Sequence, residues 1–179
     1  MYKRQFPGTC SSYHLHHVAG KAVALAEFEE FGADYARDIV ANAKALAAAL
    51  AAEGFDVLAE DRGYTASHQV LTRHGGDIDS GAGKKAAEKL EKSGIITNMN
   101  MLPGDTKAMQ PSGLRLGVPE LTRVGMGTDE MTDVAGFFAR ALIKNEESSK
   151  IKSDVKLFKS SFQTVNYCFE SGPAYSNLD

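Results

Sequence analysis

SGLRLGVPELTRVGMGTDEM, residues 112–131, decides the fold because it predicts a strand, a turn and a helix start in close succession. In the strand, Leu114, Leu116 and Val118 share one face. Arg115 lies on the other face between two glycines, and glycine weakens a strand, so this pattern suggests the close approach of a ligand. A planar guanidinium suits two-point capture of a carboxylate. The stretch taken alone still favours the alternative, an ordinary solvated arginine on a half-exposed strand.

Outward from this stretch, the hydrophobic pattern predicts five helices and four short strands. Apolar residues recur at helical spacing in residues 14–32, 35–52, 80–92, 128–142 and 151–162. Short apolar runs bounded by turn residues predict strands in residues 55–59, 67–73, 95–100 and 112–118. This order indicates an α+β protein, in which long helices precede a small and mainly antiparallel sheet that helices cover on one side.

The apolar stripes and the caps of these helices lead to specific expectations. The stripe expected to form core in the first helix consists of Val18, Ala22, Leu25 and Phe28. The buried face expected in the second helix consists of Tyr35, Ile39, Ala43, Leu46 and Leu50. Gly54 fits a left-handed cap after the second helix, and Thr128 fits an N-cap of the fourth. Gly81 and Gly83 predict a loose entrance to the third helix.

Composition and charge narrow the functional classes. The chain of 179 residues is 43% hydrophobic, which is ordinary for a soluble globular protein. Its 20 basic and 23 acidic residues give a net charge of −3 without a dense basic run, so we expect no nucleic-acid partner. No run approaches the ~18 apolar residues of a membrane span, and no apolar signal core precedes Pro7, so we expect no membrane partner. Cys10 and Cys168 have no metal-ligand spacing and fit a reducing cytoplasm.

Three polar clusters are candidates for ligand contacts. Ser11 and Ser12 precede a helix and could donate to a phosphate, although a simple N-cap is the commoner use of such residues. The histidines at positions 14, 16 and 17 have no companion cysteine or carboxylate cluster, so we expect first-turn helix residues and no metal site. Asn98 and Asn100 end a strand as short, rigid hydrogen-bonding side chains, or as turn formers ahead of Pro103.

The quoted stretch also resembles a known family. In serine hydroxymethyltransferases, a strand of the form SG-x-R-x-G-x-P leads through a TR-x-G-[FM] turn into an acidic helix start, and residues 112–131 are similar in each part. The arginine of that family holds the carboxylate of the amino-acid substrate, so the resemblance gives this role to Arg115. Further stretches agree in order and spacing, namely FPG with HLHHVAGKAVALAE (6–27), YARDIVANAKALAAAL (35–50) and GIITNMNMLPGD (94–105).

The resemblance implies roles for three more residues. In the family, the second asparagine of an N-x-N segment contacts the pterin of the folate, and Asn100 corresponds to it. A loop of the form FPG-x-QGGP reaches the cofactor phosphate of the neighbouring subunit, so Ser11 and Ser12 would make that contact here. This chain reads CSSY at the QGGP positions, a departure that suggests a divergent subgroup.

The resemblance also implies a domain organisation, that of the carboxy-terminal part of a fold-type I pyridoxal-phosphate enzyme. Residues 1–34 would end the large cofactor-binding domain, residues 35–165 would form the small domain, and residues 166–179 would be a loose tail. The cofactor lysine of the family lies in a T-H-K segment, and no lysine in this chain follows a histidine. We therefore expect a fragment, natural or truncated, that is inactive alone because it contributes no catalytic lysine.

The function implied by resemblance is that of a pyridoxal 5′-phosphate-dependent transferase. The full-length enzyme would interconvert serine and glycine, with tetrahydrofolate as the one-carbon carrier, and would be a homodimer that binds an amino-acid substrate. Two alternatives stay open. One is a folate-independent aldolase or transaldolase on the same scaffold, and the other is a small domain that binds a ligand or partner without catalysis.

Overall fold

A long helix, α1 (Leu15–Ala52), begins the part of the chain that this computed structural model describes, residues 14–174. Its sequence is rich in alanine, which has the highest helix propensity, and contains no proline. Gly32 lies within it, but one glycine costs only ~1 kcal/mol relative to alanine, too little to break a helix with good formers on both sides. The prediction of two separate helices on either side of residue 34 is therefore wrong.

The end of α1 matches the prediction at Gly54. This glycine has a φ of +96°, its N–H donates to Ala51 O at 3.0 Å, and the N–H of Phe55 donates to Leu50 O at 3.0 Å. These two bonds form the Schellman arrangement, in which the residue directly after the C-cap adopts the left-handed region. Glycine is favoured there because it has no Cβ to clash. The chain then turns directly into the sheet.

Four short strands form one antiparallel sheet in the order β1-β2-β4-β3. The strands are β1 (Asp56–Val57), β2 (Gln69–Arg73), β3 (Asn98–Asn100) and β4 (Gly113–Gly117), and the short 3-10 helix η2 (Glu60–Arg62) lies between the first two. This sheet confirms the fold class expected from the sequence. It also makes β4, the strand that carries Arg115, a central strand with partners on both sides.

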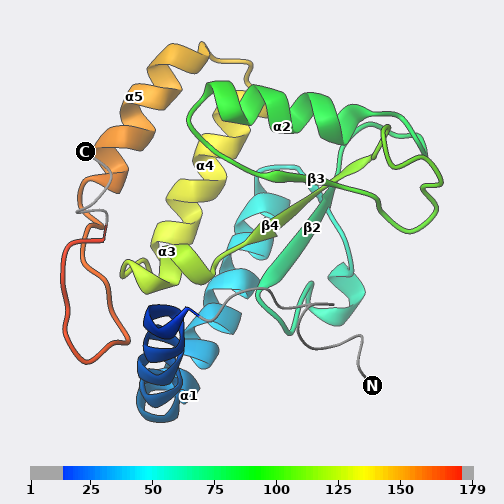
Figure 1. Cartoon of the computed structure of the whole chain (residues 1–179). Coiled ribbons are helices and arrows are strands. Elements are labelled where there is room, and N and C mark those ends of the chain that lie inside the picture. The colour runs from blue at the N-terminus through cyan, green and yellow to red at the C-terminus, as the bar shows by residue number, and fades with distance from the viewer. Residues whose placement is uncertain (1–13, 175–179) are drawn as a thin grey trace, which may run out of the picture.

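The other helices are α2 (Ala82–Lys92), α3 (Pro119–Arg123), α4 (Glu130–Leu142) and α5 (Ser148–Lys159). Figure 1 shows the second half of α1 passing behind the sheet with α4 beside it. The inward residues Leu114 and Leu116 of β4 and Val118 just after it are buried as predicted, at 0%, 4% and 0% exposure. The helical residues that close the same core are Ala43, Leu46, Leu50, Ala86, Leu90, Met131, Ala135, Phe138 and Ile151.

The first half of α1 does not form core, contrary to the prediction. Val18, Leu25 and Phe28 are 51%, 70% and 58% exposed, and the buried residues of this helix begin only at Asn42. The stripe is amphipathic, but this half of the helix extends past the sheet (Figure 1), so the sheet does not bury it. Within the described chain, this half is contacted by Arg123, which pairs with Glu27, and by Phe169, which packs on Phe31. Although α1 is long, neither it nor another helix of the described chain combines the length and apolarity needed to cross a membrane.

All four strands are shorter than predicted, and the difference matters most for β1 and β3. β1 comprises only two residues, because pairing with β2 is limited to Asp56 and Val57. β3 begins at Asn98, and Ile96, which the sequence places inside the strand, is 89% exposed. An apolar run indicates burial in general, but it does not indicate which residues have a pairing partner.

A short helix, α3, lies where the sequence suggests only a turn. Pro119 occupies its first turn, where a missing N–H costs nothing, and Thr122 Oγ1 donates to Val118 O at 2.9 Å. A helix of five residues is too short for a helical period to be visible in the sequence. The Schellman bonds at Gly125, which has a φ of +93°, then end it.

The N-terminus of α4 is capped differently from the prediction. The N-cap position belongs to Asp129 and has no side-chain cap bond, so the prediction of a Thr128 cap is wrong. Instead Glu130 Oε2 accepts a hydrogen bond from Gly127 N at 2.7 Å. A carboxylate in the first turn satisfies an N–H of the preceding turn and also interacts well with the positive end of the helix dipole.

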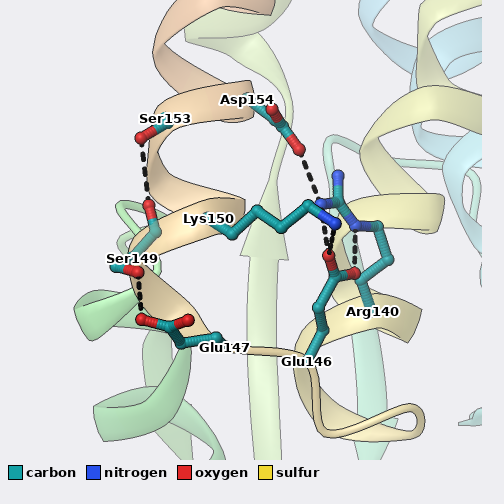
Figure 2. Close-up of polar contacts among 7 residues, drawn as sticks. All are labelled: Arg140, Glu146, Glu147, Ser149, Lys150, Ser153 and Asp154. Carbon is teal, nitrogen blue, oxygen red and sulfur yellow. Dashed lines mark hydrogen bonds and ion pairs between the residues drawn. The ribbon is translucent and has the colours of Figure 1, made fainter.

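Arg140 makes the polar contacts between α4 and α5, beside aromatic packing of Phe137 on Phe158 with ring centres 5.5 Å apart. Arg140 donates to both carboxylate oxygens of Glu146 at 2.7 and 2.9 Å and to Asp154 Oδ2 at 2.6 Å (Figure 2). Lys150 Nζ lies 3.1 Å from Glu146 Oε1. The hydrogen bonds from Arg140, and then from Lys150, lower the pKa of Glu146 to about 2. These contacts join Arg140 of α4 to Glu146, just before α5, and to Asp154 within α5.

Two aromatic residues of the segment expected as a loose tail, Tyr167 and Phe169, contact α1, while Ala174 N donates to Gln163 O at 2.7 Å. Tyr167 Oη donates to Asp38 Oδ2 at 2.8 Å, and the Tyr167 ring centre is 4.8 Å from that of Tyr35. Burial, followed by the hydrogen bond to Asp38, raises the pKa of Tyr167 to about 12. The tail lacks periodicity, but its aromatic residues still find partners on the helix. Residues 175–179 lie outside the described part.

Candidate functional site

The sheet face turned away from the core carries the candidate site. Strand alternation places Arg115 on this face, because its neighbours Leu114 and Leu116 point into the core. The register puts Asn98 of β3 directly opposite Arg115 and puts Asn100 opposite Gly113. The structure therefore brings Arg115 and Asn100, the two predicted site residues within the described chain, onto one face of two adjacent strands.

The Arg115 side chain is exposed, and within residues 14–174 it has no hydrogen-bond or ion-pair partner. Arg73, which lies on the same face of β2, differs because its Nε is 3.5 Å from Asp56 Oδ2. The backbone of Arg115 is held between two paired strands, while its guanidinium is free. A fixed backbone with an unused planar cation suits two-point binding of a carboxylate from solution.

The two glycines beside Arg115 have different environments, and only one of them leaves room for the close approach of a ligand that the sequence suggests. At Gly113 the space is filled, because a Cβ there would lie 2.4 Å from Leu102 Cγ. Leu102 is only 3% exposed and lies outside the main core cluster, so it packs on the outer face of the sheet. At Gly117 the nearest atom to a Cβ would be Pro119 Cδ at 3.7 Å. The arginine is thus open on the Gly117 side and walled on the other.

Gly83 is a packing residue and not part of a loose helix entrance. It is buried, and a Cβ on it would lie 2.3 Å from the backbone oxygen of Gly113. The first turn of α2 therefore touches the backbone of β4 directly. Glycine is needed because even a methyl group would displace the arginine strand.

The two asparagines of β3 have different environments. Asn98 is exposed and its side chain has no partner in the described chain. Asn100 is half-buried, and its Nδ2 donates to Met101 O at 2.6 Å, so its amide oxygen stays available. The family resemblance assigns a specific role only to Asn100. The N-x-N alternation was the signal for Asn98, since residues two apart share a face.

Two aspartates hold the loops beside the site, and sequence reasoning missed both. Asp105 accepts hydrogen bonds from the N–H groups of Asp79, Leu102 and Ser112, each at 2.9 Å. These bonds, the one from Asp79 first, hold the pKa of Asp105 far below its usual range. The pKa of Asp79 is also lowered, mainly by its hydrogen bond from Thr106. The only local signal was the Pro-Gly-Asp turn, because the donors come from distant parts of the sequence.

The described residues fit a carboxylate ligand but not the cofactor. Two hollows of the described surface are lined by residues of α1, the segment around α3 and Tyr167, and neither contains a lysine or Arg115. Ser11 and Ser12, the expected phosphate contacts, lie outside the described residues. No group of three metal-ligating side chains occurs within residues 14–174.

Comparison with known proteins agrees with this geometry in several ways. The sequence model of the family described as serine hydroxymethyltransferase matches residues 2–138. A serine hydroxymethyltransferase of Thermococcus kodakarensis is 52% identical over 169 residues, which are 93% of this chain and 39% of the relative. One of Cenarchaeum symbiosum is 47% identical over 178 residues, which are 97% of this chain and 40% of the relative.

A solved structure is also similar. The crystal structure of L-threonine transaldolase from Pseudomonas fluorescens superposes with a TM-score of 0.81 at 33% identity, covering 92% of this chain and 37% of that one. The present chain thus spans about two fifths of the length of the curated relatives it matches. Family match, sequence identity and the arginine-bearing antiparallel sheet lead to one conclusion: the chain belongs to the serine hydroxymethyltransferase family.

Proposed function

We propose that this chain supplies the substrate-carboxylate site of a pyridoxal-phosphate-dependent serine hydroxymethyltransferase. The observation that carries the proposal is the unpaired guanidinium of Arg115 on a central strand, opposite Asn98 and two register pairs from Asn100 on the same face. The names of the relatives support this reaction over others. The enzyme would interconvert serine and glycine, with tetrahydrofolate as the one-carbon carrier.

The contribution of Arg115 would be to bind and orient the amino acid. Two parallel hydrogen bonds from one guanidinium fix both the position and the plane of a carboxylate, and this restricts rotation of the rest of the substrate. Charge-assisted bonds to a carboxylate contribute roughly 1.5–3 kcal/mol each, so the site would bind amino acids and exclude amines that lack a carboxylate. Asn100, on the same face, would contact the pterin of the folate.

The cofactor would be held outside the described residues. We propose that residues 1–34 end a larger cofactor-binding domain and that residues 35–165 form the small domain. The exposed apolar residues in the first half of α1, such as Leu25 and Phe28, support this division because a further domain would cover them. The larger size of the relatives supports it too. On this proposal the full-length enzyme is a cytoplasmic homodimer.

A folate-independent transaldolase is the second candidate. The similar solved structure is an L-threonine transaldolase, and the CSSY sequence at residues 10–13 departs from the QGGP of the family. Both reactions would use Arg115 in the same way, because each substrate is an amino acid. The two reactions differ in whether Asn100 contacts a bound folate.

The test joins this chain to the part of the Thermococcus kodakarensis relative that it does not match. Conversion of serine with tetrahydrofolate, and folate-independent cleavage of a 3-hydroxy amino acid, are measured on the same chimaeric enzyme. Asn100→Ala should lower the folate-dependent rate by roughly tenfold, the loss expected for one hydrogen bond to a bound ligand, and should spare the cleavage. The 179-residue chain alone is the negative control and should show neither activity.

Equal losses in both assays would give Asn100 a structural role at the end of β3. A chimaera that cleaves the amino acid but never transfers the carbon to tetrahydrofolate would favour the transaldolase candidate. A folded chimaera without either activity would contradict the proposed function.

A further inference from the structure

We propose that Asp105 is a positioning residue for the site at which Arg115 binds the substrate carboxylate. The side chain of Asp105 sets how the ends of β3 and β4 meet beside Arg115. The inference rests on the proposed function of Arg115. Asp105 does not touch the substrate in this proposal. It acts through the backbone of the two strands that carry Arg115 and the asparagines.

The contacts of Asp105 join three segments of the chain. Oδ1 accepts from Asp79 N at 2.9 Å, in the loop before α2. Oδ2 accepts from Leu102 N at 2.9 Å, just after β3, and from Ser112 N at 2.9 Å and Ser112 Oγ at 2.8 Å, just before β4. One side chain therefore holds the outgoing end of β3 and the incoming end of β4 at the same point.

These contacts matter because β3 has little else to fix it. It is an edge strand of three residues that pairs only with β4. A short edge strand with few ladder bonds opens easily. Leu102, which follows Asn100 by two residues, must stay packed over Gly113 for the wall beside Arg115 to exist. The carboxylate of Asp105 holds the backbone on both sides of that contact.

A neighbouring aspartate provides a natural comparison. Asp79 accepts from Thr106 N at 2.8 Å, from Thr106 Oγ1 at 2.7 Å and from Lys107 N at 2.8 Å. It joins the same two loops, but its carboxylate does not contact either strand end. If stability of the loops were all that mattered, the two aspartates would be equivalent. The positioning role predicts that only Asp105 affects ligand binding strongly.

The first experiment measures amide hydrogen exchange on the whole 179-residue chain. Asp105→Asn keeps the shape of the side chain but has only one acceptor oxygen, and its NH₂ group faces N–H donors. We expect exchange at Leu102 and Ser112 to be faster by roughly tenfold or more, with unchanged exchange in the second half of α1. Asp77→Asn is the matched control, since Asp77 is an exposed acid of the neighbouring loop that contains Asp79 and has no side-chain partner in the described chain.

The second experiment titrates L-serine and L-serinamide, which lacks the carboxylate, into the chimaeric enzyme. Asp105→Asn should weaken L-serine binding by about tenfold, because a displaced Arg115 loses one charge-assisted bond to the substrate. The affinity for L-serinamide should stay unchanged. Asp79→Asn should weaken L-serine less, and Asp77→Asn not at all. If Asp105→Asn does not fold, Ser112→Ala replaces it as the test variant, because it removes one of the four hydrogen bonds to Asp105. It must then weaken L-serine binding by a smaller factor and leave L-serinamide binding unchanged.

The outcomes separate this inference from the function on which it rests. Unchanged exchange at Leu102 and Ser112, faster exchange with unchanged L-serine affinity, or equal weakening of both ligands would each overturn the positioning role. If Arg115→Lys in the same chimaera left L-serine affinity unchanged, the proposed function itself would fail, whatever Asp105 does.

Discussion

Replacing Gly113 with alanine tests the packing that walls one side of the candidate site. A Cβ at this position would lie 2.4 Å from Leu102 Cγ and 2.6 Å from each of its two methyl carbons. These distances are far below van der Waals contact, so either Leu102 or the strand must move. Overpacking of a buried site costs about 1–3 kcal/mol, and we expect Gly113→Ala to lower the free energy of unfolding by about 2 kcal/mol.

The same reasoning predicts coupling between the two residues. Leu102→Ala alone removes a buried side chain and should cost about 2–4 kcal/mol. In the double variant the new methyl group of residue 113 fits the vacated space, so the total cost should fall short of the sum by about 1–2 kcal/mol. Gly83→Ala should lower the free energy of unfolding more than Gly113→Ala does, because a Cβ at position 83 would lie 2.3 Å from the backbone oxygen of Gly113. Leu102→Ala should not reduce this cost.

Urea unfolding of the 179-residue chain, followed by circular dichroism, gives these free energies provided that the slope with urea stays constant. Gly136→Ala is the control, because this glycine lies inside α4 with nothing within 4 Å of its Cβ position. It should be neutral or stabilising by up to ~1 kcal/mol. Strictly additive costs of Gly113→Ala and Leu102→Ala would refute the packing of Leu102 over the arginine strand.

Two further predictions concern stability. Asn42 is 2% exposed and donates to Thr122 Oγ1 and to Met126 O, each at 2.9 Å. Asn42→Ala should therefore lower the free energy of unfolding, measured with urea, by about 2–4 kcal/mol. A cost below ~1 kcal/mol would contradict these buried bonds. The folded-state pKa of Glu146 is depressed from 4.5 to about 2, so its stabilisation should be complete above pH ~5 and lost as the pH falls towards 2. The urea midpoint should therefore fall between pH 5 and 2.5, and by less in Glu146→Gln. An equal fall in both proteins would contradict the role of this carboxylate.

The local features of the fold were predictable because each depends on neighbours in sequence. The alternation around Arg115 correctly gave its strand and its outward orientation. Gly54 was correctly identified as a helix cap, since a left-handed residue is needed within a few positions of a helix end. Burial of Leu46 and Leu50 followed from helical spacing in the same way.

Features that depend on distant residues were not predictable. The sequence shows that Gly113 flanks the arginine, but not that Leu102 occupies the space above it. The amphipathic stripe ending at Phe28 indicates a face that packs on something, but Val18, Leu25 and Phe28 are all exposed within residues 14–174. Asp105 reads as a simple turn residue, because its donors at Asp79 and Ser112 lie 26 and 7 positions away.

The direct test of the carboxylate site is the affinity of the chimaeric enzyme for L-serine when Arg115 is replaced by lysine. Lysine keeps the positive charge and loses the planar fork, so at least one charge-assisted hydrogen bond is lost. At roughly 1.5–3 kcal/mol for such a bond, the dissociation constant should rise by about tenfold or more, while affinity for the cofactor and for L-serinamide stays the same. An L-serine dissociation constant in Arg115→Lys equal to that of the unmodified chimaera would remove Arg115 from the site and contradict the account.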